Sequence, residues 1–183
     1  MPDSRILRIV YKWRVRSGLL FALVALVFAK PSLHSLLIAF GLATIGLALR
    51  TWACGNLNKD RELTMSGPYR FTRNPLYLGN LILGVAMVIA AKSWWVLAFF
   101  VAYFLVFYPV LIHVEKEKMA KLFPEQYRGY SANVPLFIPA LRAKIATQKS
   151  AFSWDLYKKN REYRALFGTI LYWTVLALKA VFF

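Results

Sequence analysis

Long apolar runs separated by short polar segments dominate the chain. At about 1.5 Å per residue, a helix needs roughly 20 apolar residues to cross a bilayer, and several runs approach that length. The connections Pro31-Ser32 and Lys92-Ser93 are short enough to predict tight antiparallel helix hairpins. The pattern predicts an all-α, polytopic integral membrane protein with about five transmembrane helices, at Ser17 to Ala29, Leu33 to Cys54, Leu76 to Ala91, Ser93 to Ile112 and Ala165 to Phe183.

The composition agrees with a membrane protein. Of the 183 residues, 59% are hydrophobic and 17% are charged, which is too apolar for a soluble domain of this size. Positive charge predicts the orientation, because Lys and Arg stay on the cytoplasmic side of a membrane. With the predicted helices, 21 of the 24 Lys and Arg residues fall on one side. The N-terminus and the active site are therefore expected to be cytoplasmic in a multi-pass protein.

A net charge of +16 raises the question of a nucleic-acid partner. The charges flank apolar spans, and no soluble domain remains to carry a binding face, so no nucleic acid is expected. Anionic membrane lipids are the expected partners of the basic residues. The basic N-terminus and the apolar run ending at Val27-Phe28-Ala29 also resemble a cleaved signal peptide, but that run leads directly into a second apolar helix with which it can pair.

No internal repeat or low-complexity tract divides the chain, so residues 1–183 are expected to form a single membrane-embedded domain. Cys54 is the single cysteine, which excludes an intramolecular disulfide and a thiolate metal cluster. No metal site is predicted, because the sequence has no histidines at metal-binding spacing. Two polar segments remain for chemistry, at 55–75 and 113–164.

The most informative polar segment is GPYRFTRNPLYLG, at 67–79, which runs directly into an apolar helix. Asn74-Pro75 favours a break followed by a helix with proline in its first turn. Backbone N–H groups at that helix N-terminus can bind a carboxylate or phosphate, and Arg70 and Arg73 place cations beside them. Interfacial anchoring would explain each arginine alone, whereas the ordered combination with prolines and glycines favours a binding site.

The second polar segment is predicted to begin with an amphipathic helix after Pro109. Spacing places Glu115 on one face with Met119 and Leu122, so this carboxylate is expected to point inward while the neighbouring lysines face water. An inward carboxylate at a membrane interface needs a partner. The alternative is a solvated surface of glutamates and lysines.

Together the two segments resemble one protein family. Residues 67–79, followed by Glu115, the sequence FPEQY at 123–127, Tyr130 and Val134-Pro135, resemble the isoprenylcysteine carboxyl methyltransferase and phospholipid methyltransferase family of integral membrane enzymes. The resemblance covers about residues 33–139 and leaves 140–183 as an interfacial segment and an extra C-terminal helix. It implies a methyltransferase that uses S-adenosyl-L-methionine and acts on a lipid or lipidated substrate.

By this resemblance, the cofactor is bound by residues from both segments: Leu63, Thr64, Tyr69, Asn74, Pro75, Leu76, Tyr77 and Glu115. Aromatic rings and a carboxylate suit the sulfonium and ammonium groups of S-adenosyl-L-methionine, while backbone amides and an arginine suit its carboxylate. Methyl transfer needs alignment more than acid–base help. No catalytic residue is therefore assigned, and Arg73 and His113 are the candidates.

The methyl acceptor and the oligomeric state stay open at this point. Family members that methylate prenylcysteine have an arginine four residues before the glutamate, where this chain has Leu111. Both a prenylcysteine carboxylate-like and a phospholipid amine-like acceptor are therefore considered. Two other functions remain: an NADPH-dependent membrane sterol-type reductase, which has similar Arg, Pro and Tyr motifs, and a non-catalytic lipid-binding membrane protein.

Overall fold

The computed structural model describes residues 5–140, 142 and 151–182. The expected interfacial segment therefore lies partly outside the described residues, at Leu141 and at 143–150. The described residues contain helices and no strand, which confirms the predicted all-α class. The elements are α1 (Arg5–Phe28), α2 (Leu33–Asn56), the short 3₁₀ helix η1 (Gly67–Arg70), α3 (Pro75–Ala91), α4 (Trp94–Leu122), α5 (Pro124–Asn133), α6 (Trp154–Lys159) and α7 (Tyr163–Phe182).

Helix ends follow the local sequence. At the start of α2, the side chains of Ser32 and Ser35 each accept a hydrogen bond from the other's backbone N–H, which forms a capping box. At the end of α3, Lys92 adopts the left-handed conformation with φ 47° and donates its N–H to the carbonyl of Val88. Both expected turns between apolar helices are therefore present.

Three helices, α2, α4 and α7, are long and apolar enough to cross a membrane by length and composition. The part of α1 from Val15 to Phe28 and the whole of α3 are apolar but shorter. The 17 residues of α3 extend about 25 Å, compared with about 30 Å for the hydrocarbon core of a bilayer. All five predicted apolar runs form helices, and three of them reach the length of a full span.

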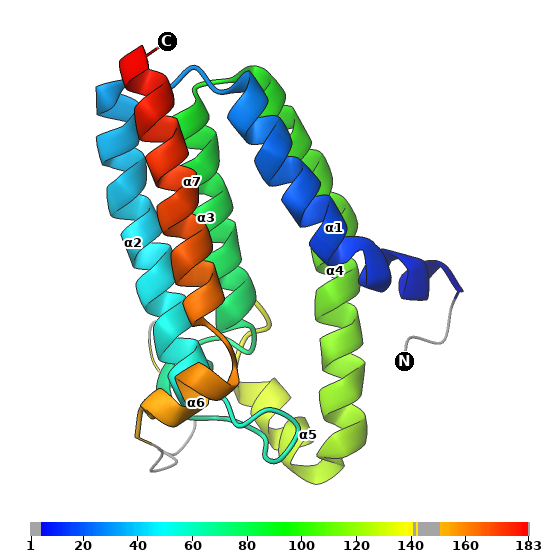
Figure 1. Cartoon of the computed structure of the whole chain (residues 1–183). Helices are drawn as coiled ribbons and strands as arrows, with labels where there is room; N and C mark the ends of the chain where they lie inside the picture. The colour runs from blue at the N-terminus through cyan, green and yellow to red at the C-terminus, as the bar shows by residue number, and fades with distance from the viewer. Residues whose placement is uncertain (1–4, 141, 143–150, 183) are drawn as a thin grey trace.

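The helices form two groups that lie close together at one end of the molecule and separate toward the other (Figure 1). One group contains α2, α3 and α7, and the other contains α1 and α4. The closest packing is between α2 and α3, where a Cβ on Gly79 would lie 3.1 Å from the backbone oxygen of Gly46 and 2.5 Å from Cγ of Arg50. The prediction that consecutive helices pack as tight hairpins is therefore wrong, because α1 packs mainly against α4 and α3 packs mainly against α2.

The helix α4 continues through Pro109 to Leu122 without interruption. The helix predicted after Pro109 is therefore present, but it continues the apolar helix instead of following an end at Ile112. Proline removes one backbone hydrogen bond of a helix, yet apolar helices accommodate it when neighbouring groups satisfy the freed carbonyl. One continuous helix therefore runs from the apolar body of the protein to its polar end, where it places Glu115.

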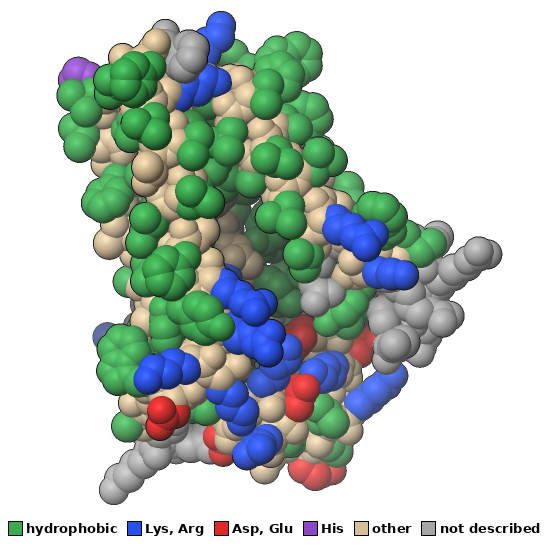
Figure 2. Space-filling view, viewed as in Figure 1, with side chains coloured by type: hydrophobic (Ala, Val, Ile, Leu, Met, Phe, Trp, Pro, Cys, Tyr) green, Lys and Arg blue, Asp and Glu red, His purple; other side chains and the backbone are tan. Residues whose placement is uncertain are grey.

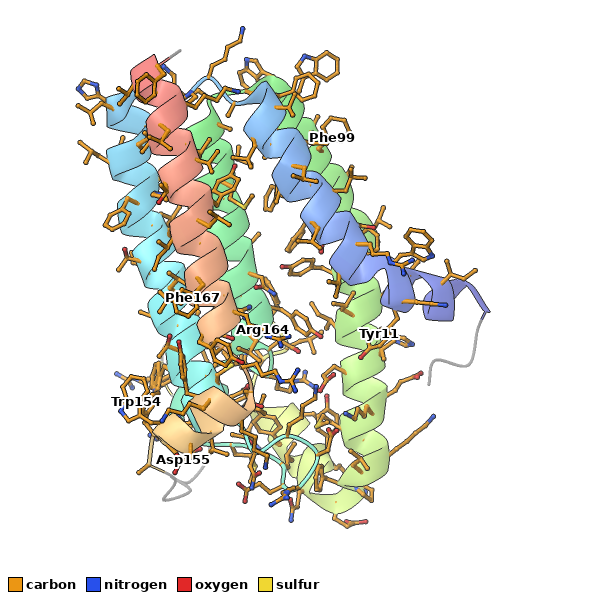
Figure 3. The ribbon with its side chains drawn as sticks, in the orientation of Figure 1. Tyr11, Phe99, Trp154, Asp155, Arg164 and Phe167 are labelled. Atoms are coloured by element: carbon orange, nitrogen blue, oxygen red, sulfur yellow. The ribbon has the colours of Figure 1, made fainter. Side chains whose placement is uncertain are left out.

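Charged side chains gather at the end where the two groups separate, around α5 and α6 (Figures 1 and 2). Hydrophobic side chains cover most of the rest of the visible face, and a hollow lies between the two groups (Figure 2). Arg164 of α7 and Tyr11 of α1 lie on opposite sides of this space (Figure 3). The fold thus combines an apolar helical body with a polar end.

Candidate functional site

A cavity of about 420 Å³ lies among the polar loops and the adjoining helix ends. All eight residues that the family resemblance implies for the cofactor line it: Leu63, Thr64, Tyr69, Asn74, Pro75, Leu76, Tyr77 and Glu115. The first three precede α3, the next four form its start, and Glu115 comes from α4. The fold therefore brings the two polar segments of the sequence to one cavity.

The motif at 67–79 is held in place by the segment that follows α5. The backbone N–H of Arg73 donates to the carbonyl of Pro135 at 3.0 Å, and the N–H of Ala140 donates to the carbonyl of Phe71 at 2.8 Å. These two bonds join two segments that are far apart in the sequence. They explain why the motif and the Val134-Pro135 sequence occur together.

Two side chains complete this attachment. The hydroxyl of Thr72, which is 2% exposed, donates to the carbonyl of Phe137 at 2.8 Å and accepts from the N–H of Asn74 at 3.3 Å. The side-chain amide of Asn74 donates to the carbonyl of Leu136 at 2.8 Å. The conformation just before α3 is therefore fixed by buried hydrogen bonds.

The N-terminus of α3 faces the cavity through Pro75, Leu76 and Tyr77. Asn74 is the N-cap residue, but its side chain makes no capping hydrogen bond within the described chain, because its amide reaches toward Leu136. The first N–H groups of a helix have no partner inside the helix, and the helix dipole adds positive potential there. This end of the cavity is consequently suited to an anionic group.

Arg73 adds a cation to the same wall of the cavity. Its Nη1 donates to the hydroxyl of Tyr127 at 3.0 Å, and its guanidinium carbon lies 5.8 Å from the centre of the Tyr127 ring. Its Nε is buried and has no hydrogen-bond partner among the described residues. An unpaired buried donor costs about 1–3 kcal/mol, so a ligand carboxylate accepting from Arg73 would be stabilised.

Two buried tyrosines form another part of the wall. Tyr130 donates its hydroxyl to the backbone carbonyl of Tyr69 at 2.8 Å, which links α5 to η1. Burial raises the pKa of Tyr69 well above the ordinary value, and the charge of Glu115 adds to this effect. Burial also raises the pKa of Tyr130, against a lowering effect of Arg73. Both phenols therefore stay protonated at neutral pH and act as neutral polar groups.

The opposite wall comes from α4, where Glu115 and Met119 both line the cavity. The predicted inward face of this helix is therefore correct for these two residues, whereas Leu122 is 46% exposed and lies away from it. Lys116 also lines the cavity. It is also exposed, as expected for the lysines around Glu115.

Charged residues of the loop before η1 stand near the cavity opening. Lys59, Asp60 and Glu62 line it, and Asp60 forms an ion pair with Lys118 of α4. Both partners of this pair are more than one-third exposed, so it is expected to contribute at most about 1 kcal/mol. The pair connects the loop to α4 without closing the cavity.

The two catalytic candidates occupy different places. Arg73 lines the cavity. His113 is not part of the lining; its Nε2 lies 3.2 Å from the carboxylate of Glu117 one turn later, and its side chain is 52% exposed. The structure thus leaves Arg73 as the candidate that can contact a ligand.

The cavity also has residues that the sequence analysis did not select. The strongest example is Arg50 of α2, which forms an ion pair with Glu162, the residue just before α7. Asn80, Cys54 and Asn160 line the cavity near this pair. One sequence signal pointed to it: an arginine inside an apolar helix needs a buried partner. Identifying Glu162 as that partner required the fold.

These features define a helical membrane protein with a partly open cavity, lined by polar and apolar side chains, next to its apolar helices. Residues 35–126 match the Phospholipid methyltransferase family, and the chain belongs to this family. The family resemblance predicted from the motifs is thereby confirmed. The match covers α2, α3, α4 and the start of α5, and leaves α6 and α7 outside it.

Two relatives share similarity with the chain in alignments 138 residues long that cover 70% of it. The Cobalt-zinc-cadmium resistance protein CzcN of Cupriavidus metallidurans is 31% identical, and the Nickel-cobalt-cadmium resistance protein NccN of Alcaligenes xylosoxydans xylosoxydans is 30% identical. The matched region spans 62% and 63% of the length of these relatives. No solved structure matches the chain significantly. In the described part of the chain, no cluster of His, Cys, Asp and Glu could hold a metal ion.

Proposed function

We propose that this protein is an integral membrane methyltransferase that uses S-adenosyl-L-methionine and modifies a lipophilic acceptor at the cytoplasmic interface. The observation that carries the proposal is the convergence on one cavity of all eight residues implied for the cofactor. A volume of about 420 Å³ also falls within the range of about 300–1,000 Å³ that is usual for small-molecule sites. Family membership supports the same reaction class.

The chemical groups of the cavity suit the cofactor. The N-terminus of α3 and the guanidinium of Arg73, which lines the cavity, would hold a carboxylate. The carboxylate of Glu115 would bind an ammonium group from the opposite wall. The rings of Tyr69 and Tyr77 offer faces to a sulfonium or to adenine. The cavity thus presents a partner for each charged group of S-adenosyl-L-methionine.

When bound, S-adenosyl-L-methionine supplies an activated methyl group. The residues of this chain then have to align the acceptor and keep water away, since alignment alone can contribute about 7–11 kcal/mol in favourable cases. Tyr69 and Tyr130 are suited to this role because they are buried, neutral and held by the hydrogen bond between them. Arg73 binds and orients, and we assign it no proton transfer.

The acceptor is proposed from the apolar surroundings of the cavity. Leu111, one turn before Glu115 on α4, is buried and apolar. It offers no cation for a carboxylate, which favours a phospholipid amine-like acceptor over a prenylcysteine carboxylate-like one. The basic surface at the polar end would contact anionic lipid headgroups (Figure 2). This contact would place the polar end, and with it the cavity, on the cytoplasmic side.

Purified protein incubated with methyl-labelled S-adenosyl-L-methionine and a total lipid extract tests the proposal. We expect label in the organic phase that depends on the protein and disappears with excess S-adenosylhomocysteine. The variant Glu115→Ala serves as the comparison and should transfer little label. If neither lipids nor lipidated peptides acquire label from the active preparation, the proposed reaction is wrong.

A further inference from the structure

A buried ion pair lies at the end of the cavity that is lined by α2 and by the segment just before α7. Nε of Arg50 lies 2.7 Å from Oε1 of Glu162, and Nη2 of Arg50 lies 2.7 Å from Oε2. The remaining nitrogen, Nη1, donates to Oδ1 of Asn80 on α3. The side chains of Arg50 and Glu162 are 15% and 5% exposed. Every nitrogen of the guanidinium is therefore engaged, and α2, α3 and the segment just before α7 meet at one point.

The segment that carries Glu162 is attached to the end of α2 by several hydrogen bonds. Asn160 donates to the backbone carbonyls of Cys54 at 3.0 Å and Leu57 at 2.8 Å. The thiol of Cys54 donates to Oε2 of Glu162 at 3.2 Å. One further bond joins the backbone of Ser153 to that of Gly55 at 2.9 Å. These hydrogen bonds to the end of α2 thus hold the segment so that Glu162 lies at the cavity.

The pair connects directly to the residues implied for the cofactor. Asn80 lies one helical turn after Tyr77 on α3, so their side chains share a face. Asn80 also hydrogen-bonds the hydroxyl of Tyr108 on α4. The rings of Tyr77 and Tyr108 meet edge to face, with their centres 5.9 Å apart. A chain of contacts therefore leads from Glu162 through Arg50, Asn80 and Tyr108 to Tyr77.

A gain in folding stability alone does not explain why such a buried ion pair is present. Removing two charges from water costs about as much as their attraction returns, and an apolar pair of similar size is often as stable. Inside an apolar helix, an ionisable residue usually marks a functional position. What the pair uniquely supplies is a fixed guanidinium that holds Asn80 in one orientation.

We propose that Glu162 is a positioning residue of the cavity: by holding Arg50 and, through it, Asn80, it fixes the wall that contains Tyr77. This inference rests on the proposed function, since Tyr77 is assigned to the cofactor. It extends the site beyond residues 35–126, the part that matches the family. The α6–α7 segment then belongs to the active site and is more than an added helix.

The single cysteine provides a direct test, because Cys54 lines the cavity, is 3% exposed and contacts Glu162. The rate of Cys54 alkylation by a maleimide should rise by at least about tenfold in Glu162→Gln, and the dissociation constant for S-adenosylhomocysteine should increase by about tenfold. The same cofactor product should protect Cys54 in the unaltered protein. Asp155→Asn is the matched control, because Asp155 is an exposed acid of the same segment and points away from the bundle (Figure 3).

Two further variants separate positioning from loss of folding. Arg50→Lys keeps the charge but cannot bind both carboxylate oxygens, so it should reproduce the effects of Glu162→Gln with the helical content retained. Exchanging the charges, with Arg50→Glu and Glu162→Arg together, should restore slow alkylation relative to either single change. This recovery is not expected if the two residues merely fill space.

The outcomes separate this inference from the proposed function. Unchanged alkylation and unchanged affinity in Glu162→Gln would overturn the inference, as would an equal effect of Asp155→Asn or no recovery in the exchanged pair. Failure of the unaltered protein to bind S-adenosylhomocysteine would overturn the proposed function. Alkylation rates are measured without ligand, and the rate in Arg50→Lys would still decide whether the pair fixes the wall, because this variant keeps the carboxylate of Glu162 beside the Cys54 thiol.

Discussion

The hydroxyl of Thr72 is predicted to hold the motif at 67–79 against the segment after α5. Thr72→Val removes this hydroxyl and keeps the shape of the side chain. Two partners are then left without it: the carbonyl of Phe137, which accepts at 2.8 Å, and the N–H of Asn74, which donates at 3.3 Å. Thr72→Ser keeps the hydroxyl and removes only a methyl group, so it is the matched control.

The magnitude follows from the two lost bonds. Each hydrogen bond contributes about 0.5–1.5 kcal/mol, and a buried group left unsatisfied costs about 1–3 kcal/mol. The carbonyl of Phe137 belongs to a half-buried residue that water can reach, and the bond from Asn74 is long. We therefore expect the local attachment to weaken by about 2 kcal/mol, or about 30-fold in its opening equilibrium.

Hydrogen–deuterium exchange in detergent measures this opening. The reporting amides are those of Ala140 and Arg73, which donate across the attachment. Their protection should fall by about 30-fold in Thr72→Val and by less than about fivefold in Thr72→Ser, while amides in the middle of α3 keep theirs. Equal losses in both variants, or no loss in Thr72→Val, would refute the reasoning.

Three further predictions concern the cavity. Tyr77→Ala and Glu115→Ala should each weaken S-adenosylhomocysteine binding by at least about tenfold, or 1.4 kcal/mol, in calorimetry; unchanged affinity in both would contradict the assigned site. Because burial raises the pKa of Tyr69 and Tyr130, the stability that their protonated forms contribute is complete below about pH 10 and is lost as pH rises through the raised pKa. The unfolding temperature should therefore stay level from about pH 7 to 9 and fall above about pH 10, less steeply in Tyr130→Phe. Lys118→Ala removes only an exposed ion pair and should change affinity by less than about threefold; a larger loss would show that this lysine contacts the ligand.

The sequence predicted the helices well because apolar runs and turn residues are local signals. Pro109 is the informative exception. A proline is expected to end a helix, but in an apolar environment the helix is the favoured way to satisfy backbone groups, so α4 continues. The packing of α1 was also mispredicted. A short turn shows that two helices follow each other along the chain, but side-chain packing decides which helices lie against each other.

The candidate site was predictable only where its residues lie in ordered motifs. The segment 67–79 and Glu115 could be selected because turn residues, cations and an inward carboxylate form a pattern. Glu162 could not, because it lies among lysines and arginines and looks like part of a charged surface. Its pairing with Arg50 joins positions 112 residues apart, and only the fold brings them together.

Isothermal titration calorimetry on the purified protein in detergent tests the central claim most directly. We predict saturable binding of S-adenosylhomocysteine at one site per chain, no heat with NADPH, and loss of the signal in Glu115→Ala. Binding of NADPH alone would contradict the claim in favour of a reductase. No binding of either compound by a folded preparation would contradict it in favour of a non-catalytic lipid-binding protein.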